Sequence, residues 1–206
     1  KRQDGDIMDF SNLTEQIKWF LSGKDDYNKA IFISGAPGMG KTYAALNYCA
    51  ENKNSLYFSF KNIDSAFALV AFCEAHPDIF SNSSDWHSFF ERLAFYGKEK
   101  RPAVFFDSVG ERNDKDKFYA ELNLFLETNS DTAIILIGRR WDNIGVPYQE
   151  LIAESLSTQE ISELLSVSDK DAVSIFCLTS GIPALLSLYS TCLLYTSPSP
   201  RDYAAS

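Results

Sequence analysis

The stretch KAIFISGAPGMGKT, residues 29–42, decides the fold of this chain. Its first part, Lys29 to Ser34, is a short apolar run that predicts a β-strand. Its second part matches GxxxxGK(S/T), a glycine-rich loop that opens a helix and is known as the P-loop. The eight residues of the loop are Gly35, Ala36, Pro37, Gly38, Met39, Gly40, Lys41 and Thr42. The strand before the loop and the helix predicted after it are the context that the motif requires.

The chemistry of the loop explains its residues. Glycines let the backbone wrap closely around phosphate oxygens, and the start of the next helix also favours an anion. Lys41 can reach the β- and γ-phosphates, and the Thr42 hydroxyl can ligate Mg²⁺. We include Tyr43, the next residue, in the nucleotide-binding stretch. The motif therefore predicts that the chain binds a nucleotide together with Mg²⁺; the alternative is a glycine-rich turn that binds no nucleotide.

A second element is the apolar run Ala103 to Phe106, which predicts a strand and ends at Asp107. A carboxylate there can hold Mg²⁺ through its water shell, or it can simply cap the next turn. Many P-loop ATPases place a glutamate directly after this aspartate, but this chain has Ser108. Glu111 is a candidate substitute for polarising the attacking water, unless it is an ordinary solvated side chain. Because general-base help is worth ~10²–10⁴ in rate, we expect hydrolysis to be slow.

A third element is Gly138-Arg139-Arg140, after the predicted strand 132–137. In a sheet ordered 5-1-4-3-2, the fourth strand lies between the first and the third. Arg139 would then face the γ-phosphate, where it could sense or neutralise the negative charge. The alternative is a surface arginine paired with carboxylates, and Arg140 is the weaker candidate of the two. The candidate catalytic residues are Lys41, Asp107, Glu111 and Arg139.

Alternating strands and helices predict a three-layer α/β fold with a parallel sheet. The predicted strands have little polar alternation, which is typical of strands buried on both faces. They span residues 29–34, 56–60, 103–106, 132–137 and, as a possible fifth, 149–153. The predicted helices span residues 11–21, 42–51, 65–75, 85–96 and 115–127. Ser84 is the predicted cap of the helix that begins at Asp85.

After the fifth strand the pattern predicts helices only. Ser157 and Glu160 form a capping box, and Ser168 caps another helix. Gly181 suits the position after a helix end, and Pro183 suits the first turn of the next helix. These signals predict a small helical subdomain that follows the sheet in the sequence.

The end of the chain is set apart by its composition. CLLYTSPSPRD, residues 192–202, resembles a translated sequencing adapter, although a natural Ser/Pro-rich tail is the alternative. We expect the native protein to continue after about Thr191 and to begin before Lys1. The predicted organisation is an N-terminal helical segment (residues 1–28), a P-loop NTPase core (29–155), a truncated helical lid (156–191) and a non-native tail (192–206).

Composition limits the function classes. The chain has 206 residues, of which 45% are hydrophobic and 23% charged, as in packed globular proteins. Lys plus Arg is 19 and Asp plus Glu is 28, a net charge of −9, so bulk charge does not favour nucleic acid or an anionic membrane as a direct partner. No apolar run approaches the ~18–20 residues of a transmembrane helix. The four cysteines form no CxxC pair, which is typical of reduced thiols, so we expect a cytoplasmic protein.

Five segments together resemble the AAA+-like ATPases of the STAND and archaeal-type ATPase group, over about Phe10 to Tyr189. They are GAPGMGKT, AVFFD, AIILIGR, SLSTQEISELL and SGIPALL. The resemblance implies that Pro183, in the Gly-x-Pro turn, lies near the nucleotide. It also implies an ATP/ADP-dependent switch and a C-terminal domain that binds DNA or a protein partner. Two features depart from the group: Ser108 replaces an acidic residue, and the Gly-Arg pair often seen near the N-terminus is missing, which leaves the adenine pocket unassigned.

Three functions fit these observations. The first is Mg–ATP binding with slow hydrolysis that serves as a conformational switch. The second is a nucleotide-gated interaction module with negligible turnover, which Ser108 favours. The third is a small-molecule kinase, against which the helical segment and the Gly-x-Pro turn count. A protein partner or effector domain is expected in the region after the helical segment.

Overall fold

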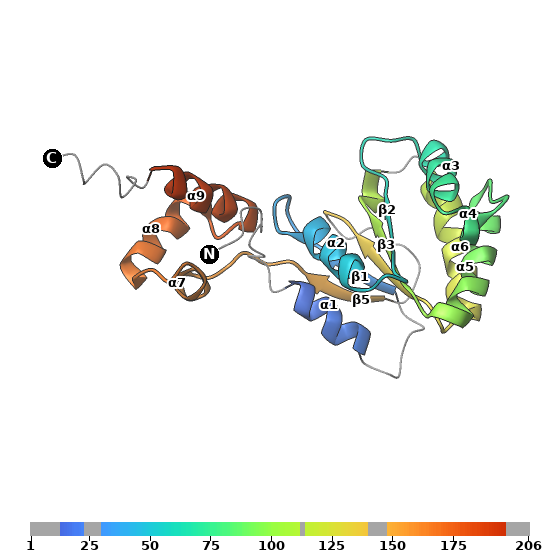
Figure 1. Ribbon diagram of the computed structural model, residues 1–206, viewed down its shortest axis with the longest axis horizontal. Helices are drawn as coiled ribbons and strands as arrows, with labels where there is room; N and C mark the ends of the chain where they lie inside the picture. The colour runs from blue at the N-terminus through green and yellow to red at the C-terminus, as the bar shows by residue number, and fades with distance from the viewer. Residues whose placement is uncertain (1–12, 23–29, 112–113, 140–147, 197–206) are drawn as a thin grey trace. The chain divides into compact units, whose positions relative to one another are not determined.

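The computed structural model of the chain describes residues 13–22, 30–111, 114–139 and 148–196 (Figure 1). The described residues form two compact units. One, which we call the sheet unit, contains the residues described between Leu13 and Pro37 and between Lys41 and Ala153. The other, the helical unit, contains Gly38–Gly40 and the residues described from Glu154 onward.

The sheet unit is built on a five-stranded sheet with the order β2-β3-β4-β1-β5. All neighbouring strands are parallel. The strands are β1 (Ala30–Ser34), β2 (Leu56–Ser59), β3 (Ala103–Asp107), β4 (Ala133–Ile137) and β5 (Tyr148–Ile152). The predicted α/β class, parallel sheet and strand order 5-1-4-3-2 are therefore confirmed.

The sequence pattern of the strands follows their place in the sheet. Every residue of β1, β3 and β4 is buried, because each of these strands has a neighbour on both edges and helices on both faces. Burial alternates in β2, and in β5 only Leu151 is buried. These two strands lie at the edges of the sheet, where less apolar surface is needed.

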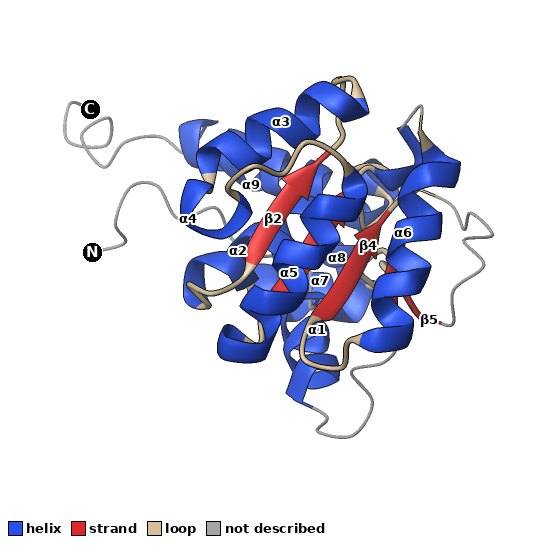
Figure 2. Cartoon of the chain, turned by 90° about the vertical axis from the view of Figure 1, so that its right-hand side faces the viewer, coloured by secondary structure: helices blue, strands red, loops and turns tan. Residues whose placement is uncertain are grey.

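Helices cover both faces of the sheet. Figures 1 and 2 show α1 and α2 on one face and α3 to α6 on the other. The helices of this unit are α1 (Leu13–Ser22), α2 (Lys41–Glu51), α3 (Ser65–Ala75), α4 (Pro77–Phe80), α5 (Trp86–Lys100) and α6 (Lys115–Thr128), with a 3₁₀ turn η1 (Val109–Glu111). A buried aromatic cluster joins the sheet to α5 and α6: Phe106 lies 6.2 Å from Phe89 and 5.1 Å from Phe118 between ring centroids. On the opposite face, Phe105 lies 5.5 Å from the Tyr48 ring of α2.

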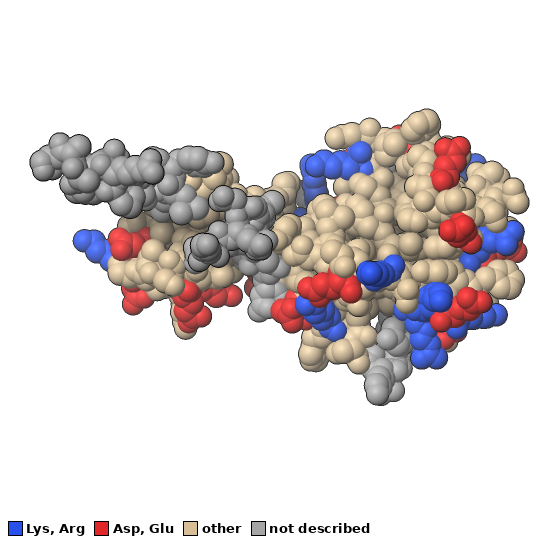
Figure 3. Space-filling view, in the orientation of Figure 1, with Lys and Arg blue, Asp and Glu red and all other residues tan. Residues whose placement is uncertain are grey.

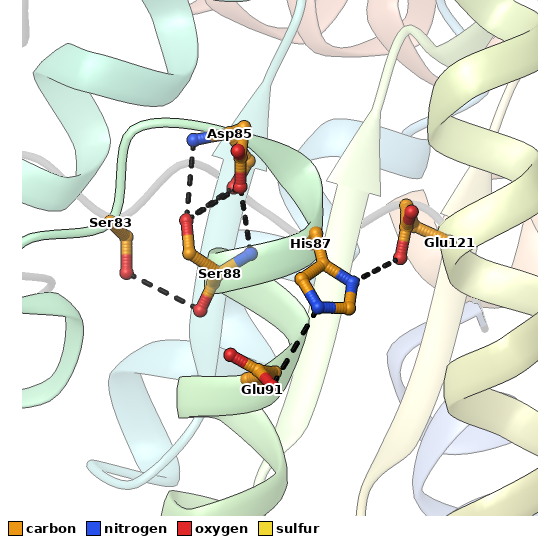
Figure 4. A network of polar contacts seen from close by, with 6 residues as sticks. All are labelled: Ser83, Asp85, His87, Ser88, Glu91 and Glu121. Carbon is orange, nitrogen blue, oxygen red and sulfur yellow. Dashed lines mark hydrogen bonds and ion pairs between the residues drawn. The ribbon is translucent and has the colours of Figure 1, made fainter.

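The cap of α5 differs from the prediction. The structure places Asp85, not Ser84, at the N-cap, and its side chain accepts the Ser88 N–H at 2.8 Å (Figure 4). The Ser88 hydroxyl accepts the Asp85 N–H in return, which completes a capping box. A carboxylate also interacts favourably with the positive end of the helix dipole, and this explains why the aspartate takes the position. The four-residue helix α4 was not predicted, because it is too short to show a periodic pattern.

The helical unit contains α7 (Thr158–Leu165), α8 (Asp169–Thr179) and α9 (Pro183–Thr196). Both predicted caps are confirmed: Ser157 and Glu160 form a capping box, and the Ser168 side chain accepts the Asp171 N–H. Helix α9 continues as far as Thr196, into the adapter-like stretch. A small apolar core holds the three helices together, and its buried members are Leu156, Ile161, Ala172, Ile175 and Leu186.

Among the described helices, no single one has the length and apolar character needed to cross a bilayer. Of the helices that the structure describes, only α8 and residues Pro183–Thr191 of α9 taken together reach the required length and composition, and a bend of 114° separates them.

The His87 side chain of α5 makes the stability of the sheet unit depend on pH. His87 Nδ1 lies 3.0 Å from Glu121 Oε2 on α6, and Nε2 lies 3.6 Å from Glu91 (Figure 4). The hydrogen bond to Glu121, followed by the charges of Glu121, Glu91 and Asp85, raises the pKa of His87 above its ordinary value near 6.5. A raised pKa means that the folded state binds the proton more tightly than the unfolded state. The stabilisation is complete below about pH 6.5 and is lost as the pH rises through the folded-state pKa.

We therefore expect Glu121→Gln to lower the pKa of His87 and to reduce the unfolding free energy more at about pH 5.5 than at about pH 8.5. The pKa can be followed by NMR titration of the His87 ring, and stability by chemical denaturation at both pH values. An unchanged His87 titration midpoint in the variant would contradict this assignment.

Candidate nucleotide-binding site

The loop between β1 and α2 has a backbone that only glycine tolerates at its start. Gly35 has a φ of +144°, and a Cβ atom there would lie 2.8 Å from the carbonyl oxygen of Ala153. Gly40, with a φ of +80°, directly precedes Lys41, the first residue of α2. The strand, the glycine-rich loop and the helix thus follow one another as the sequence predicts.

Lys41 lies against the loop that precedes it. Its Nζ donates hydrogen bonds to the carbonyl oxygens of Gly35 at 2.6 Å and Ala36 at 2.8 Å. Burial lowers the pKa of Lys41; the negative charge of Asp107 opposes this shift, and the positive charge of Arg139 adds to it. The Lys41 ammonium is therefore partly desolvated and close to a second cation. An anionic ligand at this position would stabilise both charges.

Thr42 and Asp107 meet, although 65 residues separate them in the sequence. The Thr42 hydroxyl donates to Asp107 Oδ2 at 2.6 Å. Asp107 is 5% exposed at the end of β3, whereas Thr42 is an exposed residue in the first turn of α2. The sheet order brings them together because only β4 separates β3 from β1, the strand that leads into the loop.

A residue that the sequence analysis did not single out completes this cluster. The Tyr57 hydroxyl donates to the same oxygen, Asp107 Oδ2, at 2.7 Å. Burial and the neighbouring Asp107 carboxylate raise the pKa of Tyr57, so its hydroxyl remains a donor at neutral pH. The sequence signal that could have pointed to Tyr57 is the order of the predicted sheet. It places the second strand, LYFS, beside the third, AVFFD.

Ser108 stands where many P-loop ATPases have a glutamate, and its backbone is unusual. Its φ is +61°, in the left-handed region that non-glycine residues rarely adopt. Its hydroxyl lies 3.4 Å from Asp107 Oδ1, at the long end of hydrogen-bonding distance. Such a backbone costs of order 1–3 kcal/mol. In this chain it also occurs at the helix C-caps Arg101, Ser166 and Ser180.

Glu111 and Arg139 pair with each other. Arg139 Nη2 lies 3.6 Å from Glu111 Oε1, and Glu111 Oε2 accepts the Asn62 N–H at 3.4 Å. Arg139 follows β4, which lies between β1 and β3 as predicted, and its side chain is 72% exposed. Because β1 and β4 are parallel neighbours, Arg139 follows β4 at the same edge of the sheet at which the loop follows β1. Arg140 lies outside the described residues.

The remaining predicted residues occupy two places. Tyr43 is partly buried in the first turn of α2. Pro183 is buried and begins α9, as predicted. Within the helical unit, the N–H of Ala184 donates to the Gly38 carbonyl at 3.0 Å. The contact of Pro183 with a nucleotide stays a prediction.

The donor set at Thr42 and Asp107 fits Mg²⁺ that arrives with a nucleotide. Both residues present oxygen atoms, the ligands that Mg²⁺ prefers. Among the described residues, no three His, Cys, Asp or Glu side chains gather so that they could hold a metal ion by themselves. Nucleotide-bound Mg²⁺ does not need such a cluster, because phosphate oxygens and water fill most of its positions.

The chain was compared with known proteins at three levels. No protein-family model matches it, and no curated protein does. Among solved structures, it is similar to a signal transduction ATPase with numerous domains (STAND protein) with a tetratricopeptide repeat sensor from Pyrococcus horikoshii, with a TM-score of 0.56 and 17% identity over 77% of this chain. It is also similar to RuvB of Thermotoga maritima, with a TM-score of 0.52 and 15% identity over 84% of this chain.

These likenesses define the class of fold. The parallel sheet with its strand order, the loop between β1 and α2, and the two similar solved structures show a three-layer α/β P-loop fold. The chain covers 26% of the STAND protein and 55% of RuvB, so it corresponds to one part of each.

Proposed function

We propose that this chain binds Mg–ATP at the P-loop, hydrolyses it slowly and uses the bound nucleotide as a conformational switch. The observation that carries the proposal is the hydrogen bond of 2.6 Å between the Thr42 hydroxyl and the Asp107 carboxylate, close to the Lys41 ammonium. A cation and a hydroxyl directly after a glycine-rich loop, with a buried carboxylate from β3 beside the hydroxyl, are the groups that a triphosphate and its metal require.

Each residue has a distinct part in this proposal. The loop N–H groups and Lys41 would bind the phosphates, and Lys41 would exchange its contacts with the Gly35 and Ala36 carbonyls for phosphate oxygens. Thr42 and Asp107 would hold Mg²⁺, which supplies positive charge to the β- and γ-phosphate oxygens.

The contacts of Glu111, the candidate general base, support slow turnover. Glu111 contacts Arg139 at 3.6 Å and the Asn62 N–H at 3.4 Å, so its carboxylate is held by groups other than an attacking water. Ser108 has no acidic group that could act as the general base in place of Glu111. The same two observations favour the second candidate function, a nucleotide-gated module with negligible turnover.

The switch role is supported by the way the loop is divided. Gly38–Gly40 belong to the helical unit, where the Gly38 carbonyl accepts the Ala184 N–H at 3.0 Å. A phosphate bound by the backbone of Gly38–Gly40 would act on the hydrogen bond between Gly38 and Ala184. The similar STAND protein carries a tetratricopeptide repeat sensor, which supports the proposal that a partner-binding region accompanies this chain in its complete form.

Charge supports a free nucleotide rather than nucleic acid as the ligand. On the face that Figure 3 presents, most basic side chains of the sheet unit lie among acidic ones, and one small basic group stands apart at its top. The net charge is −9. Direct nucleic-acid binding needs a continuous basic surface, and neither observation supports one.

The test is a single-turnover assay with labelled Mg–ATP and excess protein, comparing the chain with Lys41→Ala. Loss of a hydrogen bond to a charged group costs about 1.5–3 kcal/mol, so we expect roughly 10- to 150-fold weaker binding in the variant. Lys117→Ala, at an exposed lysine of α6, is the matched control and should bind like the unaltered chain.

The outcomes separate the functions. Binding that depends on Lys41, followed by slow phosphate release, supports the proposal. Binding with no release favours the module with negligible turnover. A folded chain, verified by circular dichroism, that binds no nucleotide through Lys41 would overturn both.

A further inference from the structure

Tyr57 reaches the candidate metal site from the edge of the sheet. Strand β2 pairs with β3 so that Ser59 stands beside Asp107 and Tyr57 beside Phe105. Tyr57 therefore lies two residues, roughly 6.6 Å, before the level of Asp107 along its strand. The long side chain of tyrosine carries its hydroxyl across that distance, and it donates to Asp107 Oδ2 at 2.7 Å.

The hydrogen bond from Tyr57 is one of two short contacts to the Asp107 carboxylate. Oδ2 receives hydrogen bonds from Tyr57 at 2.7 Å and from Thr42 at 2.6 Å, whereas the Ser108 hydroxyl lies 3.4 Å from Oδ1. A carboxylate that is 5% exposed needs such donors, because it has lost most of its water. Thr42 is also assigned to present its oxygen to the metal, whereas Tyr57 is assigned no metal contact, so Tyr57 can keep its hydrogen bond to the carboxylate while the metal is bound.

We propose that Tyr57 is a positioning residue for Mg²⁺: it fixes the orientation of the Asp107 carboxylate and leaves Oδ1 available to the water shell of the metal. This inference rests on the proposed function, because it assigns a residue to the same nucleotide site. In this assignment Tyr57 acts on the metal only through Asp107.

The expected effect is on metal affinity and not on nucleotide affinity. Removing a hydrogen-bonding partner of a metal ligand typically weakens metal binding 10- to 100-fold. Tyr57→Phe deletes one oxygen and keeps the ring, so the sheet should fold as before. We expect that this variant reaches half of the metal-dependent change in nucleotide binding at an Mg²⁺ concentration at least about 10-fold higher than the unaltered chain.

The experiment measures binding of a fluorescent ATP analogue, first in EDTA and then with increasing Mg²⁺. It compares the unaltered chain, Tyr57→Phe and Tyr96→Phe. Tyr96 is the matched control, since its hydroxyl donates to the Asn54 carbonyl at 3.1 Å rather than to the site. Thermal unfolding of each variant verifies that the fold is retained.

The result expected is the same affinity in EDTA for all three proteins and a raised Mg²⁺ midpoint for Tyr57→Phe alone. A purely structural role of Tyr57 would not separate these two quantities. Equal Mg²⁺ midpoints in Tyr57→Phe and the unaltered chain would overturn the inference and leave the proposed function standing. Failure of the unaltered chain to bind the analogue would instead overturn the proposed function, and this inference with it.

Discussion

Replacing Asp107 with asparagine is expected to remove the Mg²⁺ dependence of nucleotide binding and to lower any ATP turnover by more than about 100-fold. Losing an outer-shell partner of a metal costs up to about 100-fold, and Asp107, which is assigned to hold Mg²⁺ through its water shell, also supplies a negative charge. Asparagine keeps the shape of the side chain, and its carbonyl oxygen has two lone pairs, so it can still accept the hydrogen bonds from both Thr42 and Tyr57. It lacks the negative charge that attracts the metal.

The measurement is the same nucleotide titration in EDTA and in Mg²⁺, followed by single-turnover phosphate release. Asp116→Asn is the matched control, because Asp116 is exposed in the first turn of α6. The control should behave like the unaltered chain in both assays. If Asp107→Asn retained full Mg²⁺ dependence, Asp107 would be only the cap of a turn, the alternative that the sequence analysis left open.

The features of this fold that could be predicted from the sequence are those set by contiguous residues. Apolar runs such as Ala133–Ile137 predict strands buried on both faces, and the glycine-rich loop identifies β1 and α2. The strand order followed from the fold class that this loop indicates. The N-cap of α5 was assigned one residue too early, because Ser84 and Asp85 are both good caps and only the backbone geometry distinguishes them.

The site was predictable where the P-loop pattern covers it and not where distant residues meet. Asp107 was recognised because it ends an apolar strand, but the contribution of Tyr57 depends on the register of β2 against β3 and on a side-chain rotamer. The pairing of Glu111 with Arg139 depends in the same way on two segments that follow different strands. Each residue was proposed separately as a catalytic helper, and their ion pair emerges only in three dimensions.

Replacing Gly181 with alanine is expected to unfold the helical unit while the sheet unit stays folded. Gly181 has a φ of +67°, and an added Cβ would lie 2.1 Å from the backbone oxygen of Leu156. The backbone would have to move, and the hydrogen bond of 2.8 Å from the Leu156 N–H to the Gly181 carbonyl would be lost or weakened. The left-handed backbone costs an L-residue about 1–2 kcal/mol, and the hydrogen bond contributes about 1 kcal/mol. With the steric clash added, we expect a total cost of about 3 kcal/mol or more.

A loss of this size should exceed the stability that a small core provides, since only a few side chains hold α7, α8 and α9 together. Hydrogen exchange measured by mass spectrometry can follow peptides from these helices and from the sheet separately. The matched control is Ser180→Gly, which relieves a left-handed backbone at the preceding residue (φ +52°) and should leave protection unchanged or slightly raised. Equal protection of α7 to α9 in Gly181→Ala and the unaltered chain would show that the loop adapts to the extra methyl group, and that the turn before Pro183 is less constrained than its geometry indicates.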